Sequence, residues 1–322
     1  MIRPDADLAR RMNVELYERL AAALQHLVVD VLGRPSVTVL APSPATFGLQ
    51  GLLRDRALAF DLDGVAALLD RFHPVLGPGA TPEGLVRPLA EPWFTPAEGE
   101  ILRLGFTDDI GLTARLEAPP SDVAEETAAT VSAVLAYMAQ DAPGWHEEFR
   151  ALVSQVVLAS AAGGRQTFAG ASAFDLWGAI LINPSYRRDP VHLAMTLVHE
   201  SSHLKLFHAY LDDEIVLNDP AERYGSPLRR ELRPMNGLYH AAFVLARMAA
   251  FATAMMESRT ATPVFGPQGA EQFQAEAQAA VARFDSAHEI IVRHGRLTPK
   301  GAALIAEAAF AVDEARHLAL AA

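Results

Sequence analysis

The stretch DPVHLAMTLVHESSH, residues 189–203, combines a helix start with two histidines four residues apart. The aspartate at its start offers a side-chain cap and the proline after it suits the first helical turn, so a helix is predicted to begin here. On a helix of about 3.6 residues per turn, His199 and His203 lie on the same face, one turn apart. Both imidazoles can therefore converge on one divalent metal ion, with Glu200 on the same turn.

The predicted helix carries an apolar stripe beside its histidines. Large apolar residues recur at three-, four- and seven-residue intervals, at Leu193, Leu197, Leu204, Phe207 and Leu211. This spacing predicts a half-buried helix. A glutamate directly after the first histidine can reach a metal-bound water or orient another ligand, and the whole pattern is typical of zinc metallopeptidases.

A short apolar run precedes this helix. The sequence WGAILINP, residues 177–184, closes with Asn-Pro and predicts a buried strand that ends in a turn. A strand that leads into a capped metal-binding helix is the arrangement of zincin-type active sites. We therefore expect a mainly α (α+β) fold, with a zincin-like core of a short sheet and the metal-binding helix, surrounded by further helices.

Helical periodicity and turn-forming residues divide the rest of the chain. A short strand is expected at residues 37–40, and prolines and glycines predict irregular structure over residues 73–96. The predicted helices cover residues 7–31, 121–139, 145–161, 236–258, 271–294 and the segment from about 301 to 318. We expect an N-terminal helical and irregular region, residues 1–120, packed on a metal-binding catalytic region, residues 121–322, in one globular unit overall.

Composition excludes several classes of protein and site. The chain has 322 residues, of which 51% are hydrophobic, so a sizeable core is possible. The absence of cysteine excludes disulfides, thiolate ligands and iron–sulfur clusters, so nitrogen and oxygen must hold any metal. A net charge of −12 argues against nucleic-acid binding.

No uninterrupted apolar run approaches the roughly 18–20 residues that span a bilayer. The first residues lack the apolar core of a signal peptide. We therefore expect a cytoplasmic protein without a membrane partner.

The third protein ligand of a catalytic metal must come from outside the helix, because such sites usually take three. His240 is one candidate, since it lies near the start of the next strongly apolar predicted helix. Glu222 is the other, because its spacing from His203 is close to that of metallopeptidases with a glutamate ligand on the next helix. Turn-forming sequence on both sides of Glu222 leaves it little helix, which favours His240.

Arginines near the expected site are candidates for binding a carboxylate. Arg247 lies two turns beyond His240 on the same helical face, and Arg229 and Arg233 precede that helix. A guanidinium offers a planar fork of donors that matches a carboxylate. The alternative for each arginine is an ion pair with one of the many acidic residues.

Several motifs in a fixed order resemble a known family. They are Phe168 and Ser172, then GAILINP at 178–184, LVHESSH at 197–203, SPLR at 226–229 and RPMNGLYH at 233–240. In this order they resemble the HExxH-motif peptide-modification proteins found beside the precursors of ribosomally synthesised, post-translationally modified peptides. The similarity covers roughly residues 165–260, with a weaker match at residues 297–301. One departure is Leu228, where the family usually has tryptophan.

The resemblance implies a non-haem iron(II), α-ketoglutarate-dependent oxygenase that hydroxylates a side-chain carbon, commonly the β-carbon, of a peptide residue. It would make His199, His203 and His240 the iron ligands. One arginine among the three candidates would anchor the distal carboxylate of α-ketoglutarate, with O2 as the second co-substrate. The oligomeric state and the peptide remain open.

Two other functions stay open at this level. One is a zinc-dependent metallopeptidase that trims a precursor peptide, in which Glu200 is the general base. The other is a catalytically inert peptide-binding protein with a vestigial site. In the oxygenase Glu200 would instead orient a ligand, a water or the substrate. Three histidines fit hydrolytic zinc as well as iron, so the residues alone do not choose the metal.

Overall fold

The computed structural model describes residues 1–36, 42–77, 84–110, 115–164, 168–186, 189–225, 232–256 and 264–321. Its residues group into two compact units. The first unit comprises Met1–Ala6, Thr130–Arg150 and Asp189–Ala322, and the second comprises Asp7–Ala129 and Ala151–Arg188. The segments of the two units alternate along the chain, so the units have other boundaries than the expected regions 1–120 and 121–322. The expected division stays a prediction.

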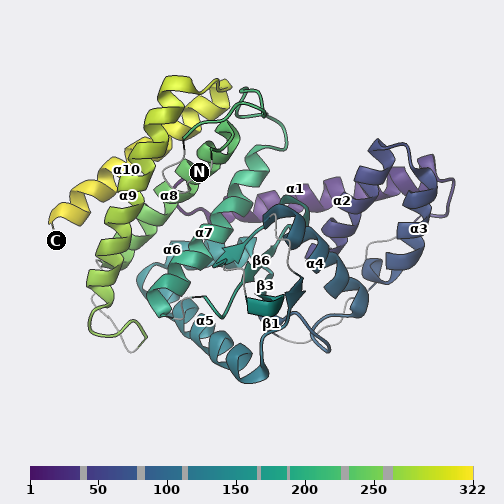
Figure 1. Ribbon diagram of the computed structural model, residues 1–322, viewed down its shortest axis with the longest axis horizontal. Helices are drawn as coiled ribbons and strands as arrows, with labels where there is room; N and C mark the ends of the chain where they lie inside the picture. Colours follow the sequence, from purple (N-terminus) through teal and green to yellow (C-terminus); the bar gives the residue numbers. More distant parts are fainter. Residues whose placement is uncertain are drawn as a thin grey trace. The chain divides into compact units, whose positions relative to one another are not determined.

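Long helices build the first unit. They are α7 (Pro190–Ala209), α8 (Met235–Met256), α9 (Gly269–His294) and α10 (Pro299–Ala321), together with most of α5 (Ser121–Asp141) and α6 (Pro143–Leu152). α8, α9 and α10 lie side by side (Figure 1), and α8 also packs against α7. Because three helices pack around α8, its apolar side chains form the centre of this unit's core, with Phe243 and Val244 buried.

α8 is, among the residues that the structure describes, the one helix long and apolar enough to cross a membrane. In the sequence, Asn236, His240 and Arg247 interrupt this apolar stretch. Inside the protein, 72% of its most apolar window is buried. The core helix of a globular protein has the same length and composition.

Shorter helices and a small sheet build the second unit. Its helices are α1 (Ala6–Gln25), continued by a π-helical turn (His26–Val31), α2 (Pro44–Leu58), α3 (Leu62–Phe72) and α4 (Pro96–Ile110), with short 3-10 turns at His73–Leu76, Ala162–Gly164 and Phe174–Leu176. Its strands are β1 (Val86–Pro88), β2 (Leu116–Glu117), β3 (Gln155–Leu158), β4 (Ser160–Ala161), β5 (Gly170–Ala171) and β6 (Ala179–Ile182). A capping box explains the start of α2: the side chains of Ser43 and Thr46 each accept a hydrogen bond from the backbone N–H of the other residue.

The main sheet is mixed, with the strand order β1-β3-β6-β5. β3 pairs in parallel with both neighbours, so that Val156 lies opposite Val86 and Ile180, while β5 runs antiparallel to β6. Every residue of β6 is buried. Such an unbroken apolar run is expected for a strand that is covered on both faces.

The mainly α fold with a short sheet is confirmed, and so are most of the predicted elements. The strand predicted within residues 177–184 is β6, and the predicted opening helix is α1 with its π-helical extension. The helices predicted to begin near residues 121, 236, 271 and 301 are α5, α8, α9 and α10. The strand predicted at residues 37–40 lies outside the described residues.

One predicted helix is wrong in its second half. The helix expected over residues 145–161 ends at Leu152, and Gln155–Leu158 forms the inner strand β3. The β-branched residues Val156 and Val157 pack in the sheet between two parallel neighbours, and this tertiary environment overrides the helical spacing. The irregular segment expected over residues 73–96 likewise contains the edge strand β1.

Candidate metal centre

α7 begins where the sequence predicts. The carboxylate of Asp189 accepts a hydrogen bond from the backbone N–H of His192 at 2.8 Å, and Pro190 occupies the first turn. The prediction of a half-buried helix is wrong, because α7 is buried on almost every side. From Val191 to Ala209 every residue is buried except four histidines.

Three of these four half-buried histidines share one face of α7. At about 100° per residue, His192, His199 and His203 fall within an arc of about 40°, whereas His208 is turned about 140° from His203. Apart from His208, the partly exposed residues between Val191 and Ala209 are therefore histidines on one face. Such a face is unusual for a core helix and is suited to binding a ligand.

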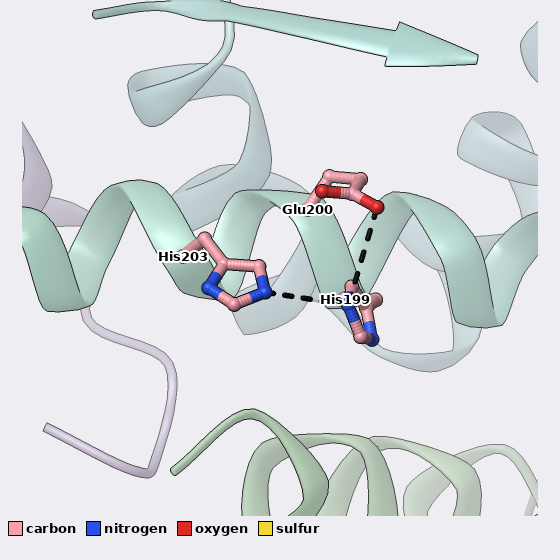
Figure 2. Close-up of side chains that lie close together, drawn as sticks. All are labelled: His199, Glu200 and His203. Carbon is pink, nitrogen blue, oxygen red and sulfur yellow. Dashed lines mark hydrogen bonds and ion pairs between the residues drawn. The ribbon is translucent and has the colours of Figure 1, made fainter. Parts of the chain in front are cut away.

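His199, Glu200 and His203 bring their ligand atoms together (Figure 2). The three residues each offer one nitrogen or oxygen, and these atoms all lie within 4.8 Å of one another. The two Nε2 atoms of the histidines are 3.3 Å apart. Two nitrogens bound to one octahedral or tetrahedral metal are about 3.0–3.4 Å apart when each bond is about 2.1 Å, so the pair has the spacing of metal ligands.

A contact with the sulfur atom of Met248 favours the tautomer of His199 that can bind a metal. Its Nδ1 lies 3.3 Å from Sδ of Met248, on α8. Because a thioether can only accept a hydrogen bond, this contact places the proton of a neutral imidazole on Nδ1. The Nε2 atom then carries a lone pair and faces His203, as a metal ligand requires.

His240 joins this group from α8. Its ring centroid is 5.9 Å from that of His203, and the rings of Phe207 and Tyr210 pack against it at 5.9 and 5.1 Å. Tyr210 donates a hydrogen bond to Oδ1 of Asn236 at 2.6 Å. The structure therefore brings the third predicted histidine to the edge of the pair, with aromatic side chains around it.

Burial keeps all three imidazoles neutral. Desolvation lowers the pKa of His199 to about 4, with a smaller effect from the charge of His192. The pKa of His240 is also lowered to about 4 by burial and then by Arg233, and burial followed by His199, His240 and Arg233 holds the pKa of His203 well below its ordinary value. Neutral imidazoles at pH 7 are ready to bind a metal without losing a proton.

The metal-free protein is expected to lose stability as the pH falls from about 6.5 towards 4. The pKa values of the three histidines lie below 6.5 in the folded state, so the unfolded chain binds more protons in this window and is favoured there. Urea unfolding in the presence of a chelator measures this dependence. A variant with glutamine at all three positions is the control, and an equal slope in both proteins would contradict the assignment.

Glu200 is buried beside the pair. Its side chain is 6% exposed, and Oε1 lies 4.0 Å from Nε2 of His199. This carboxylate lies close enough to orient a bound water or to neutralise part of a metal's charge.

Glu222, the alternative third ligand, belongs to a different network. Its carboxylate accepts hydrogen bonds from the hydroxyl of Tyr224, from Nδ2 of Asn218 at 3.2 Å and from Arg296 at 3.3 Å. These contacts lower its pKa, the Tyr224 hydrogen bond most of all. In the described structure the compact group of ligand atoms contains His199, Glu200 and His203, and neither Glu222 nor His240 belongs to it. His240 differs from Glu222 in that its ring lies close to that of His203.

Arg233 is the arginine that the structure places beside the histidines. Its positive charge lowers the pKa of both His203 and His240. A Cβ atom on Gly237 would lie 3.3 Å from Nε of Arg233, so the guanidinium group lies across the first turn of α8, one turn before His240. Arg229 lies outside the described residues.

Arg247 lies fully buried in an ion cluster with Glu148 and Lys205, which we call the Glu148 cluster. Its Nε donates to the hydroxyl of Ser202 at 2.9 Å, Nη1 donates to the carbonyls of Met1 and Ile2, and Nη2 pairs with Glu148. Its nitrogens are thus engaged by the protein itself. This placement disfavours Arg247 as an anchor for a co-substrate, and that role stays a prediction without structural support.

Glu148 and Lys205, the other members of the Glu148 cluster, were not predicted as functional or structural residues from the sequence. Lys205 donates to Glu148 and to the carbonyl of Arg3, and burial, followed by the charge of Arg247, lowers its pKa to about 8. A lone lysine between Leu204 and Leu206 in an apolar helix was an available signal for a buried ion pair. Glu148 carries no such signal in its own segment.

No known family model matches this sequence, and no curated protein is significantly similar to it. The resemblance to the HExxH-motif peptide-modification proteins therefore stays a prediction.

Proposed function

We propose that the protein is a non-haem iron(II), α-ketoglutarate-dependent oxygenase that hydroxylates a side-chain carbon, commonly the β-carbon, of a peptide. The observation that supports this proposal most is the presence of Arg233 beside His203 and His240, two of the three neutral histidines. A zinc site for hydrolysis needs only the metal ligands and a base. A guanidinium next to the ligands suits a co-substrate that carries a second carboxylate.

His199, His203 and His240 would hold the iron, which supplies the redox chemistry that activates O2. Their neutral state leaves the 2+ charge of the metal uncompensated by the three ligands. A dianionic co-substrate neutralises this charge, and its distal carboxylate can pair with Arg233. Glu200, which is buried beside His199, would orient the ligands or the peptide without binding the metal.

The proposal extends to the core around the site and to the partner of the protein. In chain order β6 directly precedes α7, as expected for a zincin-like core, which we keep as part of the proposal. The partner would be a ribosomally synthesised precursor peptide, modified in the cytoplasm. Neither a nucleic acid nor a membrane is needed for this reaction.

Reconstitution under anaerobic conditions tests the proposal. Iron(II) and α-ketoglutarate together should give a weak visible charge-transfer band, and an Arg233→Ala variant should require more α-ketoglutarate to reach it. On addition of O2, one oxygen atom enters the peptide as a hydroxyl group and the other enters succinate, while CO2 leaves. Succinate measured with a panel of precursor peptides, and peptide mass, report the two products. The absence of both the band and succinate would exclude this function.

Glu200 favours a second candidate function, a zinc metallopeptidase. Its buried carboxylate, 4.0 Å from Nε2 of His199, has the position of a general base for a metal-bound water. The third possibility, an inert peptide-binding protein, is not favoured by a particular contact. Near-stoichiometric metal in the purified protein would argue against it.

Glu200→Gln is expected to separate the two enzymes. In a peptidase the substitution removes the base, so that cleavage of the peptide is abolished while zinc is retained. In an oxygenase it removes an orienting contact, so that succinate formation falls about 10–100-fold without being lost. Peptide mass with the zinc-loaded protein and succinate with the iron-loaded protein measure the two activities. An intact peptide after incubation with the zinc-loaded wild type would rule out the peptidase.

A further inference from the structure

Hydrogen bonds connect the segment before Arg233 to the turn between α9 and α10. Asn218 is buried, and its Nδ2 donates to the hydroxyl of Tyr224 and to the carbonyl of His294, both at 2.9 Å. Its Oδ1 accepts from the backbone N–H of Arg296 at 2.6 Å. One amide side chain thus ties this segment to the end of α9 through both of its polar atoms.

Tyr224 extends this connection. Its hydroxyl accepts from Asn218 and donates to the carboxylate of Glu222, and its ring lies against that of His294, with centroids 5.6 Å apart. We call Asn218, Glu222 and Tyr224 the Tyr224 latch. Hydrogen bonds between a charged carboxylate and a phenol are among the stronger ones in proteins.

The backbone of Tyr224 holds Arg233. The N–H of Tyr224 donates to the carbonyl of Arg233 at 2.8 Å, and the N–H of Arg233 donates to the carbonyl of Tyr224 at 2.9 Å. This pair of hydrogen bonds fixes the main chain of Arg233 just before α8 begins. The side chain then lies across Gly237, which has no Cβ to displace it.

We propose that Tyr224 is a positioning residue that fixes Arg233 beside His203 and His240 and so sets the affinity of the site for a dicarboxylate. The hydrogen bonds of the latch reach the main chain of Arg233, so the latch acts on the site through Arg233. The proposal also gives Glu222 a role, because its carboxylate accepts the hydrogen bond that holds the hydroxyl of Tyr224 in place. This inference rests on the proposed function, because α-ketoglutarate is the dicarboxylate in question.

Tyr224→Phe is expected to weaken α-ketoglutarate binding by about 5–20-fold, the size of one or two lost hydrogen bonds. The substitution keeps the ring that lies against His294 and removes only the hydroxyl. Titration calorimetry with the metal-loaded protein under anaerobic conditions measures this affinity. Metal affinity should change less than about twofold, because the histidines keep their places. Tyr137→Phe, at a tyrosine of α5 whose ring lies against Phe265, is the matched control.

A double-mutant comparison distinguishes positioning from general weakening of the fold. In an Arg233→Ala background, Tyr224→Phe should cause no further loss of α-ketoglutarate affinity, because its effect passes through the missing guanidinium. Additive losses, or an unchanged affinity in Tyr224→Phe alone, would overturn the proposal.

A separate measurement tests the role of the latch independently of the proposed function. If the metal-loaded wild type binds no α-ketoglutarate, the oxygenase proposal fails. Hydrogen exchange of the segment 232–240 then tests the latch alone. We expect faster exchange of this segment in Tyr224→Phe than in the wild type, and equal exchange would overturn the positioning role.

Discussion

His203→Ala is expected to lower the affinity for a divalent metal by at least about 100-fold and to abolish succinate formation. His203 is the central ring of the group, 5.0 Å from the ring of His199 and 5.9 Å from that of His240. Removing it leaves two imidazoles that share no close contact, and the loss of even an outer partner of a metal ligand costs about 10–100-fold. Competition with a chelating dye measures the affinity for zinc, and anaerobic titration measures that for iron.

The matched control for this substitution is His208→Ala. His208 is a half-buried histidine of the same helix and is turned about 140° away from His203, so it should bind no metal at the site. Circular dichroism of both variants checks that α7 remains folded. Metal affinity within about twofold of the wild type in His203→Ala would exclude the three-histidine site.

Local sequence signals were sufficient to predict α7 and its histidine pair. The Asp189 cap, the proline after it and the spacing of His199 and His203 all act within one helix, where geometry follows directly from residue separation. The proximity of His240 to this pair could not be predicted from helix geometry alone, because it depends on the packing of α8 against α7. Its position near the start of an apolar helix was only an indirect indication of that packing.

Contacts between distant segments could not be predicted in this way. Glu148 is 57 residues from Lys205 and 99 residues from Arg247, and no periodicity relates them. Arg247, on the same helical face as His240, was a candidate to bind the carboxylate of a co-substrate, yet it belongs to the Glu148 cluster. The contact of Met248 with His199 also joins two helices. Helix geometry gives the direction of a side chain, but the packing of neighbouring segments determines its partner.

Glu148→Ala is expected to destabilise the protein by about 3–5 kcal/mol, the usual cost of removing one partner from a buried ion pair. Glu148 is 2% exposed and is the carboxylate that pairs with both Lys205 and Arg247 in this cluster. Its loss would leave two buried cations, with the carbonyls of Met1, Ile2 and Arg3 as acceptors. Chemical denaturation followed by circular dichroism measures the free energy of unfolding.

The neighbouring Glu147 provides the control, because it precedes Glu148 on α6 and is exposed; Glu147→Ala should change stability by less than about 0.5 kcal/mol. A triple variant, Glu148→Leu with Lys205→Met and Arg247→Met, should regain most of the lost stability, because no charge then stays buried without a partner. If Glu148→Ala cost no more than Glu147→Ala, the cluster would not stabilise the fold. If the triple variant were as unstable as Glu148→Ala, cavity formation and lost packing, and not uncompensated charge, would explain the effect.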